Sequence, residues 1–402
     1  MVIFSQQFKQ YSDVLQQYRS YWQFLPFSCE VLPWQGTTLQ QLLSQLTELQ
    51  LNELEQDAIA QQQLLQPFFP DLFQLAKLEQ RQGDRAAASL PALPFWLANG
   101  IGGRKLEQID ALCQHWPQLP LPVLEWCAGK GHLGRVLAHR FARPVVSVEW
   151  QQSLCQQGSE LADKLALPQQ FICADVLRQP LSGVLQPQQQ VVALHACGQL
   201  HIRLLQQVVA AGCQQLQLVP CCYHLISSDL YQPLSTLGQQ RDLALSKEDL
   251  KLVVQGQVTG GDRTERLRHT EVLWRLAYDE LRKQLTGQHS YQPLASVAKH
   301  WFSGEFSAFA QWAAQQHGLR LPAKFSSEEY LQRAKTRLLL VKQIQLVRHL
   351  FRRPLEVWLA LDKALFLQQH GYSVSLTEFC DYQLTPRNML LQASKMATAA
   401  GS

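Results

Sequence analysis

Residues 121–134 read LPVLEWCAGKGHLG and decide the fold of the chain. A short apolar run, Val123 and Leu124, leads into Glu125, and three glycines then follow at the spacing Gly-x-Gly-x-x-Gly over residues 129–134. This pattern predicts a strand, a tight turn and a helix. Glycine tolerates unusual backbone conformations and places no side chain against a ligand, so we expect an adenosine-containing cofactor on this turn.

Four more apolar runs follow this stretch, at residues 145–150, 170–176, 191–198 and 216–224. They alternate with segments of helical periodicity, which indicates a parallel sheet covered on both faces. Runs at 372–379 and 388–394 are long enough to close the sheet as a pair with one antiparallel edge. The predicted fold is therefore α/β, with a Rossmann-like, mostly parallel sheet of seven strands.

The rest of the chain has helical patterns that divide it into regions. Apolar residues recur at helical spacing in 8–24 and 38–51, and later in 263–285, 325–350 and 355–369. Ser326 with Glu329 forms a candidate capping box before the longest of these helices. We expect a helical N-terminal region at 1–95, a core at 96–224, a helical insertion at 225–354, and completion of the core at 355–402.

Composition sets broad limits on what the protein does. The 402 residues are 46% hydrophobic with a formal net charge of +4, which suits a globular protein and permits a nucleic-acid partner without requiring one. The first residues lack a signal-peptide pattern and no apolar window reaches membrane length, so we expect a cytosolic protein without a membrane partner. Of ten cysteines only Cys221 and Cys222 are adjacent, and reduced thiols are expected.

The glycine motif is shared by dinucleotide enzymes and by methyltransferases that use S-adenosylmethionine (SAM). Glu125 suits a cofactor with a cationic amino group near the turn, whereas it would repel a pyrophosphate. Asp175 closes the third strand, where it can accept a hydrogen bond from an adenine amine. Together with the antiparallel edge pair, these features favour SAM.

With these motifs in place, the chain resembles a class I SAM-dependent methyltransferase over residues 99–395. The segments LHACG, VPCCYH and TPRN narrow the resemblance to a group related to the eukaryotic tRNA 2′-O-methyltransferases. One departure is Cys127, which stands where the commonest methyltransferase turn has its first glycine. The backbone at Cys127 must then avoid positive φ or accept strain.

The resemblance implies SAM as the cofactor and a set of residues that hold it. It places Glu149 on the ribose hydroxyls, and Asp175 with Val176 around the adenine. The remaining cofactor contacts expected from it are Glu125, Cys127, Gly129, Gly131, Leu133, His195 and Cys197.

The ends of the fourth and fifth strands carry the richest chemistry, and we interpret them as the acceptor side of the site. The candidate catalytic residues are His224 as a base, Tyr223 as a stacking or orienting group, and Cys222 as part of the pocket. The His-x-Cys and Cys-Cys-x-His segments also raise the possibility of zinc, but the usual two-residue gap between cysteines is missing, so no metal is predicted. Cysteines that only fill space at crowded strand ends remain an open alternative.

The leading hypothesis is a SAM-dependent methyltransferase that acts on a macromolecule, RNA or more narrowly a tRNA hydroxyl. A basic, glycine-rich loop at 99–105 and the cations of the insertion would contact phosphates. The expected substrate-binding residues are Arg104, Lys105, Cys221, Arg387 and Asn388. The alternatives are a protein methyltransferase and a non-catalytic SAM-fold scaffold that binds RNA or protein; the sequence leaves the oligomeric state open.

Overall fold

The computed structural model describes residues 2–79, 90–179, 181, 183–255, 262–322 and 324–396. The chain divides into two compact units. The first comprises Met1–Gln17, Gln74–Gln255 and Arg352–Ser402, and the second Tyr18–Phe73 and Gly256–Phe351. The regions expected at 1–95 and 225–354 each contribute residues to both units.

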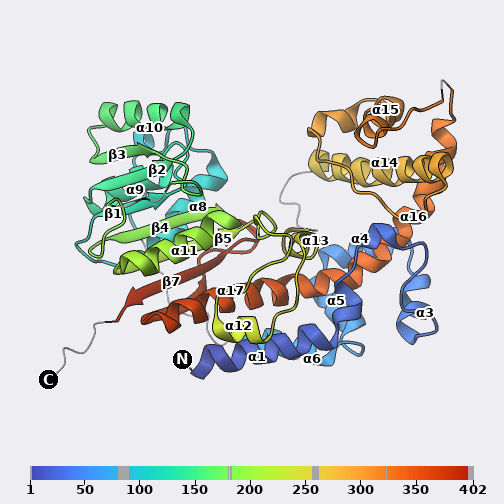
Figure 1. The fold of residues 1–402 in the computed structure, drawn as a ribbon, viewed down its shortest axis with the longest axis horizontal. Coiled ribbons are helices and arrows are strands. Elements are labelled where there is room, and N and C mark those ends of the chain that lie inside the picture. Colours follow the sequence, from blue (N-terminus) through green and yellow to red (C-terminus); the bar gives the residue numbers. More distant parts are fainter. Residues whose placement is uncertain are drawn as a thin grey trace. The chain divides into compact units, whose positions relative to one another are not determined.

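The first unit contains a seven-stranded sheet in the order β3-β2-β1-β4-β5-β7-β6 (Figure 1). Its strands are β1 Val123–Trp126, β2 Val145–Glu149, β3 Gln169–Cys173, β4 Gln190–Cys197, β5 Gln215–Cys221, β6 Tyr372–Glu378 and β7 Met389–Lys395. β1 to β5 pair in parallel, and β7 runs antiparallel to both β5 and β6. The predicted fold class is confirmed.

The strand order reverses between β1 and β4, which are neighbours in the sheet. Because parallel crossovers are right-handed, this reversal puts the helices after β1 and β2 on one face and the helix after β4 on the other. The crevice at such a switch point lies outside the carboxyl ends of the strands and is the usual ligand position in open α/β sheets. The helices of this unit are α1 Val2–Gln17, α7 Phe95–Ala98, α8 Gly103–Gln114, α9 His132–Phe141, α10 Gln152–Lys164, α11 Gln199–Ala211, α12 Thr236–Gln240, α13 Lys247–Lys251, η3 Leu252–Val254 and α17 Arg352–Gln369.

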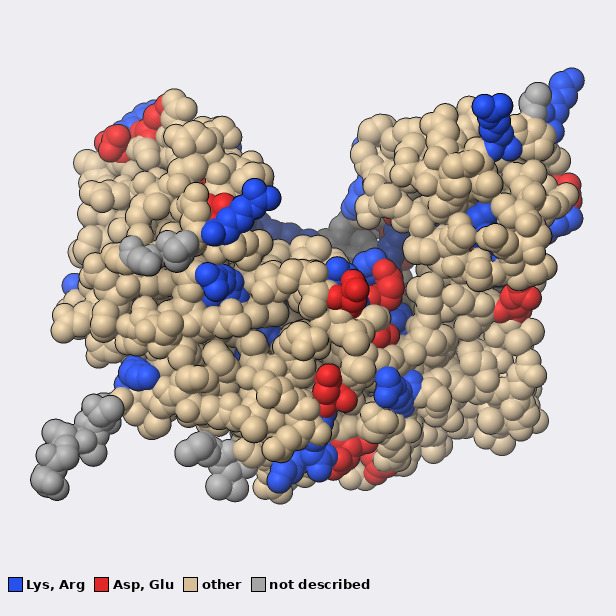
Figure 2. Space-filling model, viewed as in Figure 1, with Lys and Arg blue, Asp and Glu red and all other residues tan. Residues whose placement is uncertain are grey.

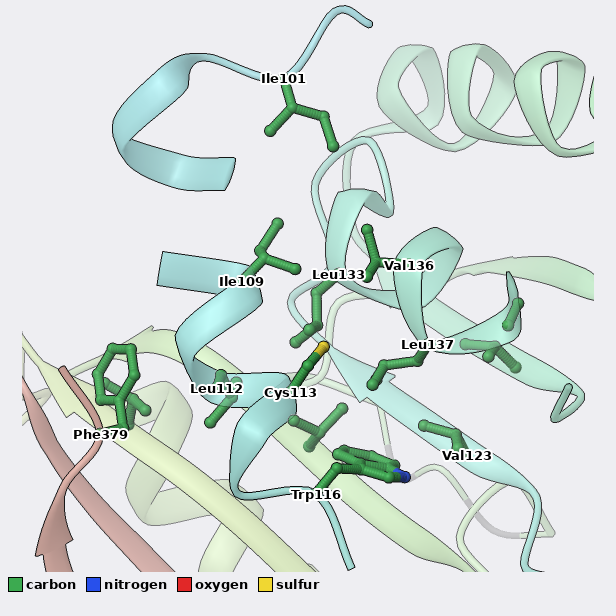
Figure 3. Close-up of a cluster of buried hydrophobic side chains, with 14 of the residues drawn as sticks. Ile101, Ile109, Leu112, Cys113, Trp116, Val123, Leu133, Val136, Leu137 and Phe379 are labelled. Atoms are coloured by element: carbon green, nitrogen blue, oxygen red, sulfur yellow. The ribbon is translucent and has the colours of Figure 1, made fainter. Parts of the chain in front are cut away.

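One hydrophobic cluster joins α8 and α9 to the sheet. Ile109 and Leu112 of α8 lie beside Leu133 and Leu137 of α9, with Val123 of β1 below them (Figure 3). These side chains are at most 2% exposed, and each contributes about 1.5–3 kcal/mol by leaving water. This packing holds the helix after the glycine turn firmly against β1.

The second unit is helical, and α6 Pro70–Glu79 begins in it and continues into the first. Its other helices are α2 Arg19–Trp22, η1 Pro26–Ser28, α3 Thr38–Ser44, α4 Glu48–Gln56, α5 Ala58–Leu65, α14 Asp262–Thr286, η4 Lys299–Ser303, α15 Phe306–Gln316, α16 Ser327–Arg348 and η5 His349–Phe351. A hydrophobic cluster around Trp274, Phe309 and Leu338 packs α14, α15 and α16 together. Among the described helices of the chain, none combines the length and apolarity needed to cross a bilayer.

Several predicted boundaries differ from the structure. The single helix expected at 38–51 is two helices, α3 and α4, because the Thr47 side chain accepts from the Gln50 N–H and Gln50 caps Thr47 in return, which starts a new helix. The expected basic loop at 99–105 ends early, since α8 begins at Gly103 and places Arg104 and Lys105 in its first turn. Ser326 caps α16 by accepting from the Glu329 N–H at 3.3 Å, but the Glu329 carboxylate pairs with Arg333 instead of completing the expected capping box.

Two strands are shorter than the apolar runs predict. β3 ends at Cys173 and β5 at Cys221, so Asp175, Tyr223 and His224 lie in the segments that follow the strands. At β5 the cause is the next residue, Cys222, whose φ of 44° is incompatible with an extended strand.

The third glycine of the turn, Gly134, lies in α9 directly against a buried polar group. A Cβ atom built on Gly134 would lie 2.5 Å from Glu125 Oε2 and 2.9 Å from Ser147 Oγ. Both neighbours belong to buried strands, β1 and β2, and have little room to move. Glycine at this position is therefore needed for the close approach of helix and sheet.

We expect Gly134→Ala to lower the free energy of unfolding by about 1–3 kcal/mol, because the added methyl group overpacks the contact between α9 and β1. The measurement is urea unfolding followed by circular dichroism. Gly103→Ala is the matched control, because a Cβ there meets nothing within 4 Å. Equal stability of the two variants would contradict this account of Gly134.

Candidate active site

The carboxyl ends of β1, β4 and β5 share an unusual backbone feature. Cys127 follows β1, His195 lies within β4 and Cys222 follows β5, and their φ angles are 56°, 62° and 44°. Each is a non-glycine residue in the left-handed region, which costs on the order of 1–3 kcal/mol and is concentrated at functional sites. The sequence left two possibilities for Cys127, and the structure shows that its backbone takes positive φ. The strand ends at the switch point are thus the candidate site.

Beneath the glycine turn lies a buried polar network that centres on Glu125. The Ser147 hydroxyl donates to Glu125 Oε2 at 2.7 Å, and the Gln169 amide donates to Ser147 Oγ at 2.9 Å and to the Gly131 carbonyl at 3.0 Å. Burial raises the pKa of the Glu125 carboxyl to about 7, although hydrogen bonds from Ser147 and Gly134 partly oppose the rise. Glu125 therefore supports the turn from below. Sequence reasoning missed Gln169 and Ser147, which are polar residues of β3 and β2.

Glu149 connects the ends of β1 and β2. Its carboxylate accepts from the Gly129 N–H at 2.9 Å and from the Gln151 N–H at 3.0 Å, and the residue is 6% exposed. A Cβ on Gly129 would meet nothing within 4 Å, so the turn has open space on that side. The next residue, Trp150, is 65% exposed and offers a flat apolar surface beside Glu149. The sequence signal that could have identified Trp150 is a tryptophan directly after the acidic residue that ends an apolar run.

The residues expected around the adenine and the methionine end differ in exposure. Asp175 is half-buried, accepts from the Leu177 N–H at 3.0 Å and lies 3.4 Å from the Arg178 guanidinium. Val176 is 4% exposed, and Leu133 is 2% exposed within the hydrophobic cluster of α8 and α9. Because its side chain is occupied in that cluster, Leu133 has only its backbone to offer a cofactor.

At the ends of β4 and β5, three thiols lie together. The Sγ atoms of Cys197 and Cys221 are 3.0 Å apart, and that of Cys222 is within 4.8 Å of both. The thiols of Cys197 and Cys221 both donate toward the His195 carbonyl. The pKa of Cys222 is lowered, because hydrogen bonds from Cys197 and Cys221 stabilise its thiolate. The structure thus brings together three of the predicted site residues from two strands.

Two histidines and one arginine surround this thiol cluster. His195 Nε2 is 2.7 Å from Gln108 Oε1 of α8, a residue that the sequence did not single out. His195 Nδ1, His224 Nδ1 and Arg387 Nε are buried and have no hydrogen-bond partner among the described atoms. Burial lowers the pKa of His195 to about 4, with Arg387 and Lys105 adding to the effect, and burial also lowers the pKa of His224. Both rings are therefore neutral at neutral pH and able to accept a proton.

Two of the predicted residues are enclosed by the protein. Tyr223 is 1% exposed, with its ring against His201 and the Lys363 ammonium 4.9 Å from the ring centroid. Its ring has no exposed face for a stacked base in this structure. Asn388 is fully buried and donates to the Cys380 carbonyl at 2.9 Å, so it fastens the connection between β6 and β7.

The cations predicted to bind substrate differ in exposure. Arg104 and Lys105 are exposed on the first turn of α8. Arg387 is half-buried, and its charge acts on His195, Cys197, Cys222 and His224. Lys105 acts on Glu125, His132 and His195. Of these three cations, Lys105 and Arg387 therefore act on side chains at the strand ends.

Comparison with known families gives this site its class. Residues 104–229, which contain β1 to β5 and the thiol cluster, match the family model described as "Methyltransferase domain". This segment is a class I SAM-dependent methyltransferase domain. A search of curated proteins found no match.

Three solved structures are also similar to the chain. Coclaurine N-methyltransferase, bound to N-methylheliamine and SAH, has 14% identity over 44% of this chain and 60% of its own, at a TM-score of 0.26. A sarcosine dimethylglycine methyltransferase structure from Galdieria sulphuraria has 10% identity over 74% and 81%, at 0.23. The cyclopropane synthase MmaA2 from Mycobacterium tuberculosis has 13% identity over 74% and 85%, at 0.25.

This chain spans 60% of the length of coclaurine N-methyltransferase. The TM-scores are low, so the class of the methyltransferase domain rests on the strand order and the family match. The open side of Gly129 and the buried, unpartnered nitrogens at the strand ends fit a site that receives both a cofactor and an acceptor.

We expect Glu125 to make the stability of the methyltransferase domain depend on pH. Its folded pKa of about 7 lies above the ordinary 4.5, so the folded chain holds the proton more tightly, and the free energy of unfolding falls as the pH rises from 4.5 to 7. The loss is roughly 3 kcal/mol. Denaturant unfolding of the cofactor-free protein at several pH values measures it. Glu125→Gln removes this part of the pH dependence, whereas Glu160→Gln, at an exposed site on α10, leaves it unchanged.

Proposed function

We propose that this protein transfers the methyl group of SAM to RNA, with a hydroxyl as the acceptor. The observation that carries the proposal is the meeting of two neutral histidines and a half-buried arginine at the strand ends beside the glycine turn. A hydroxyl acceptor must lose a proton, for which a neutral imidazole is a suitable base. An RNA acceptor carries phosphates, for which arginine and lysine are the natural partners.

The cofactor is expected to lie between the glycine turn and the ends of β2 and β3. Gly129 gives access to the backbone, Glu149 can share its carboxylate with the ribose hydroxyls, and Asp175 marks the adenine end. The exposed ring of Trp150 supplies an apolar face for the adenine. When bound, SAM supplies an electrophilic sulfonium methyl group, so the protein has mainly to align the acceptor with it.

On the acceptor side, the two histidines and Arg387 have different proposed roles. His224 is the proposed base, because its unpartnered Nδ1 can take the hydroxyl proton. His195 is held by Gln108, and Arg387 provides the charge that an RNA phosphate would meet. Tyr223 is buried, and its ring packs against His201 and the Lys363 ammonium.

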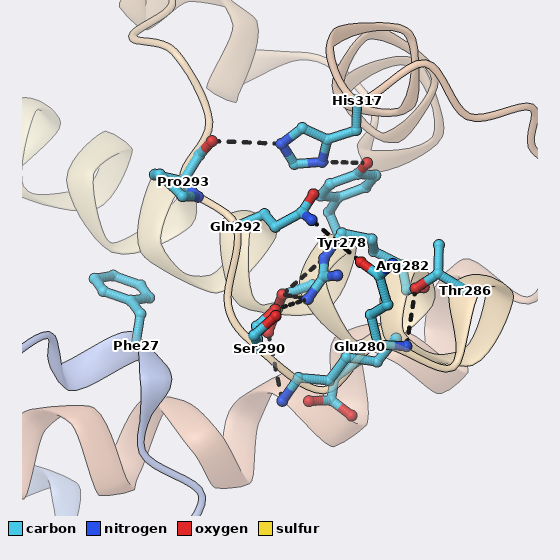
Figure 4. A network of polar contacts seen from close by, with 12 residues as sticks. Phe27, Tyr278, Glu280, Arg282, Thr286, Ser290, Gln292, Pro293 and His317 are labelled. Atoms are coloured by element: carbon cyan, nitrogen blue, oxygen red, sulfur yellow. Dashed lines mark hydrogen bonds and ion pairs between the residues drawn. The ribbon is translucent and has the colours of Figure 1, made fainter.

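The cations of the second unit support this assignment less than the sequence suggests. Six of its arginines and lysines are already paired with acids of the same unit, in Arg275–Glu271, Arg282–Asp279, Lys283–Glu30, Arg333–Glu329, Arg337–Glu280 and Lys342–Glu48. Arg282 also donates to the Ser290 carbonyl within a local polar network that includes Tyr278 and His317 (Figure 4). On the face shown in Figure 2, charged side chains lie in small separate groups. The proposal therefore assigns phosphate contacts to Arg104, Lys105 and Arg387.

We expect Glu149→Gln to weaken SAM binding by about 10- to 100-fold, since a lost hydrogen bond to a charged group costs about 1.5–3 kcal/mol. Isothermal titration calorimetry with SAM measures the affinity. Glu160→Gln on α10 is the control and should bind SAM as the unaltered protein does. If both variants bind SAM equally well, Glu149 is not a cofactor ligand.

We expect labelled SAM to transfer its methyl group to RNA when the protein is incubated with fractionated cell extract. Nuclease should release the label and protease should not. Lys105→Ala and Arg387→Ala should each raise KM for RNA and reduce the salt dependence of binding by about one phosphate contact. Lys164→Ala, at an exposed site on α10, is the control. Label that protease removes would identify a protein methyltransferase instead.

A further inference from the structure

The thiols of Cys197, Cys221 and Cys222 form a cluster that the methyl-transfer chemistry does not require. All three Sγ atoms lie within 4.8 Å of one another, and the residues are buried or half-buried. They come from the ends of two strands, β4 and β5, so their positions in the sequence do not show that the three thiols meet. No other group of three or more histidine, cysteine or acidic side chains among the described residues comes together in this way.

A bulge in β4 brings the first of these thiols into place. Leu194 pairs with Val219 and Ala196 with Pro220, so His195 is an extra residue in the strand and Cys197 pairs with Cys221. With regular pairing, Ala196 would face Cys221 and no thiol would stand there. The bulge is local to this position, and its extra residue has a φ of 62°. The sheet register is thus altered at the point where it aligns two cysteines.

A second backbone feature brings in Cys222. Successive side chains of a strand point to opposite faces, which would separate the thiols of Cys221 and Cys222. The left-handed conformation of Cys222 breaks that alternation and leaves its sulfur within 4.8 Å of both others. Two strained residues, His195 and Cys222, therefore have the same result, which is the convergence of three sulfur atoms.

A positively charged side chain lies near the three thiols, which would carry a net negative charge with a metal bound. Three thiolates around a divalent cation have a net charge of −1, and the guanidinium of Arg387 acts on Cys197 and Cys222. Zinc binds thiolates at about 2.3 Å, which puts tetrahedral sulfur ligands about 3.8 Å apart. To reach this geometry, Cys197 and Cys221 would separate by roughly 0.8 Å from their 3.0 Å spacing, and Cys222, within 4.8 Å of both, would settle at the same distance.

We propose that Cys197, Cys221 and Cys222 bind a zinc ion through their three thiolates. The three sulfurs fill three of the four tetrahedral positions, and the fourth is open to water or to an acceptor group. Soft thiolate ligands favour zinc over magnesium or calcium, which prefer oxygen ligands. The inference concerns the metal alone and does not depend on RNA as the methyl acceptor.

The full chain, purified under reducing conditions without chelators, is expected to contain about one zinc per molecule by elemental analysis. Cys197→Ser, Cys221→Ser and Cys222→Ser should each lose most of the metal. Cys29→Ser, which removes a half-buried thiol of the second unit, should retain it. Circular dichroism of each variant verifies that it is folded.

Cobalt replacement tests the ligands directly and needs no variant. After zinc is removed with a chelator, added cobalt should produce the intense thiolate-to-cobalt charge-transfer band in the near ultraviolet, and zinc should abolish it. Bound zinc should also slow alkylation of Cys222 by iodoacetamide. The proposal is overturned if the reduced protein takes up neither zinc nor cobalt. A mass lower by two hydrogens with Cys197 linked to Cys221, and no metal uptake after reduction, would overturn it in favour of a disulfide.

Discussion

The structure depends on one backbone constraint, the left-handed conformation of a non-glycine residue at the ends of three neighbouring strands. Cys127, His195 and Cys222 each take positive φ, at a cost of on the order of 1–3 kcal/mol for each residue. The packing of α8 and α9 on the sheet and the buried pairing of β1, β4 and β5 offset that cost. In return the chain leaves the sheet sharply at the switch point, and polar side chains converge there instead of pointing to opposite faces.

A buried hydrogen-bond network connects the carboxyl ends of the strands to the interior of the sheet. Glu125, Ser147 and Gln169 come from three adjacent strands and form one buried hydrogen-bonded chain that ends at the Gly131 carbonyl. A buried carboxyl with a pKa near 7 is costly to ionise, and its retention in the core indicates that the turn needs polar support from below. The cofactor turn is therefore held on one side by apolar packing and on the other by this network.

Much of the fold could be predicted, because near-continuous apolar runs and a glycine turn leave few arrangements for a parallel sheet. The seven strands and the antiparallel edge follow from those patterns. The site was predicted less completely. Side-chain direction at strand ends depends on φ values that residue type does not specify. Tyr223 and Asn388 turned out to be buried, and Gln108, Gln169 and Trp150 went unrecognised because each lies in a segment with another evident role.

The sequence by itself determined the α/β class, the position of the cofactor turn and the strands that end beside it, since these follow from local hydrophobic periodicity and glycine spacing. Only the tertiary structure decided which side chains meet. Adjacent cysteines in a strand should point apart, and Cys197 is 24 residues from Cys221. A one-residue bulge and one left-handed residue bring all three thiols together. Strand pairing and backbone strain are properties of the assembled sheet, so no local pattern in the chain reveals them.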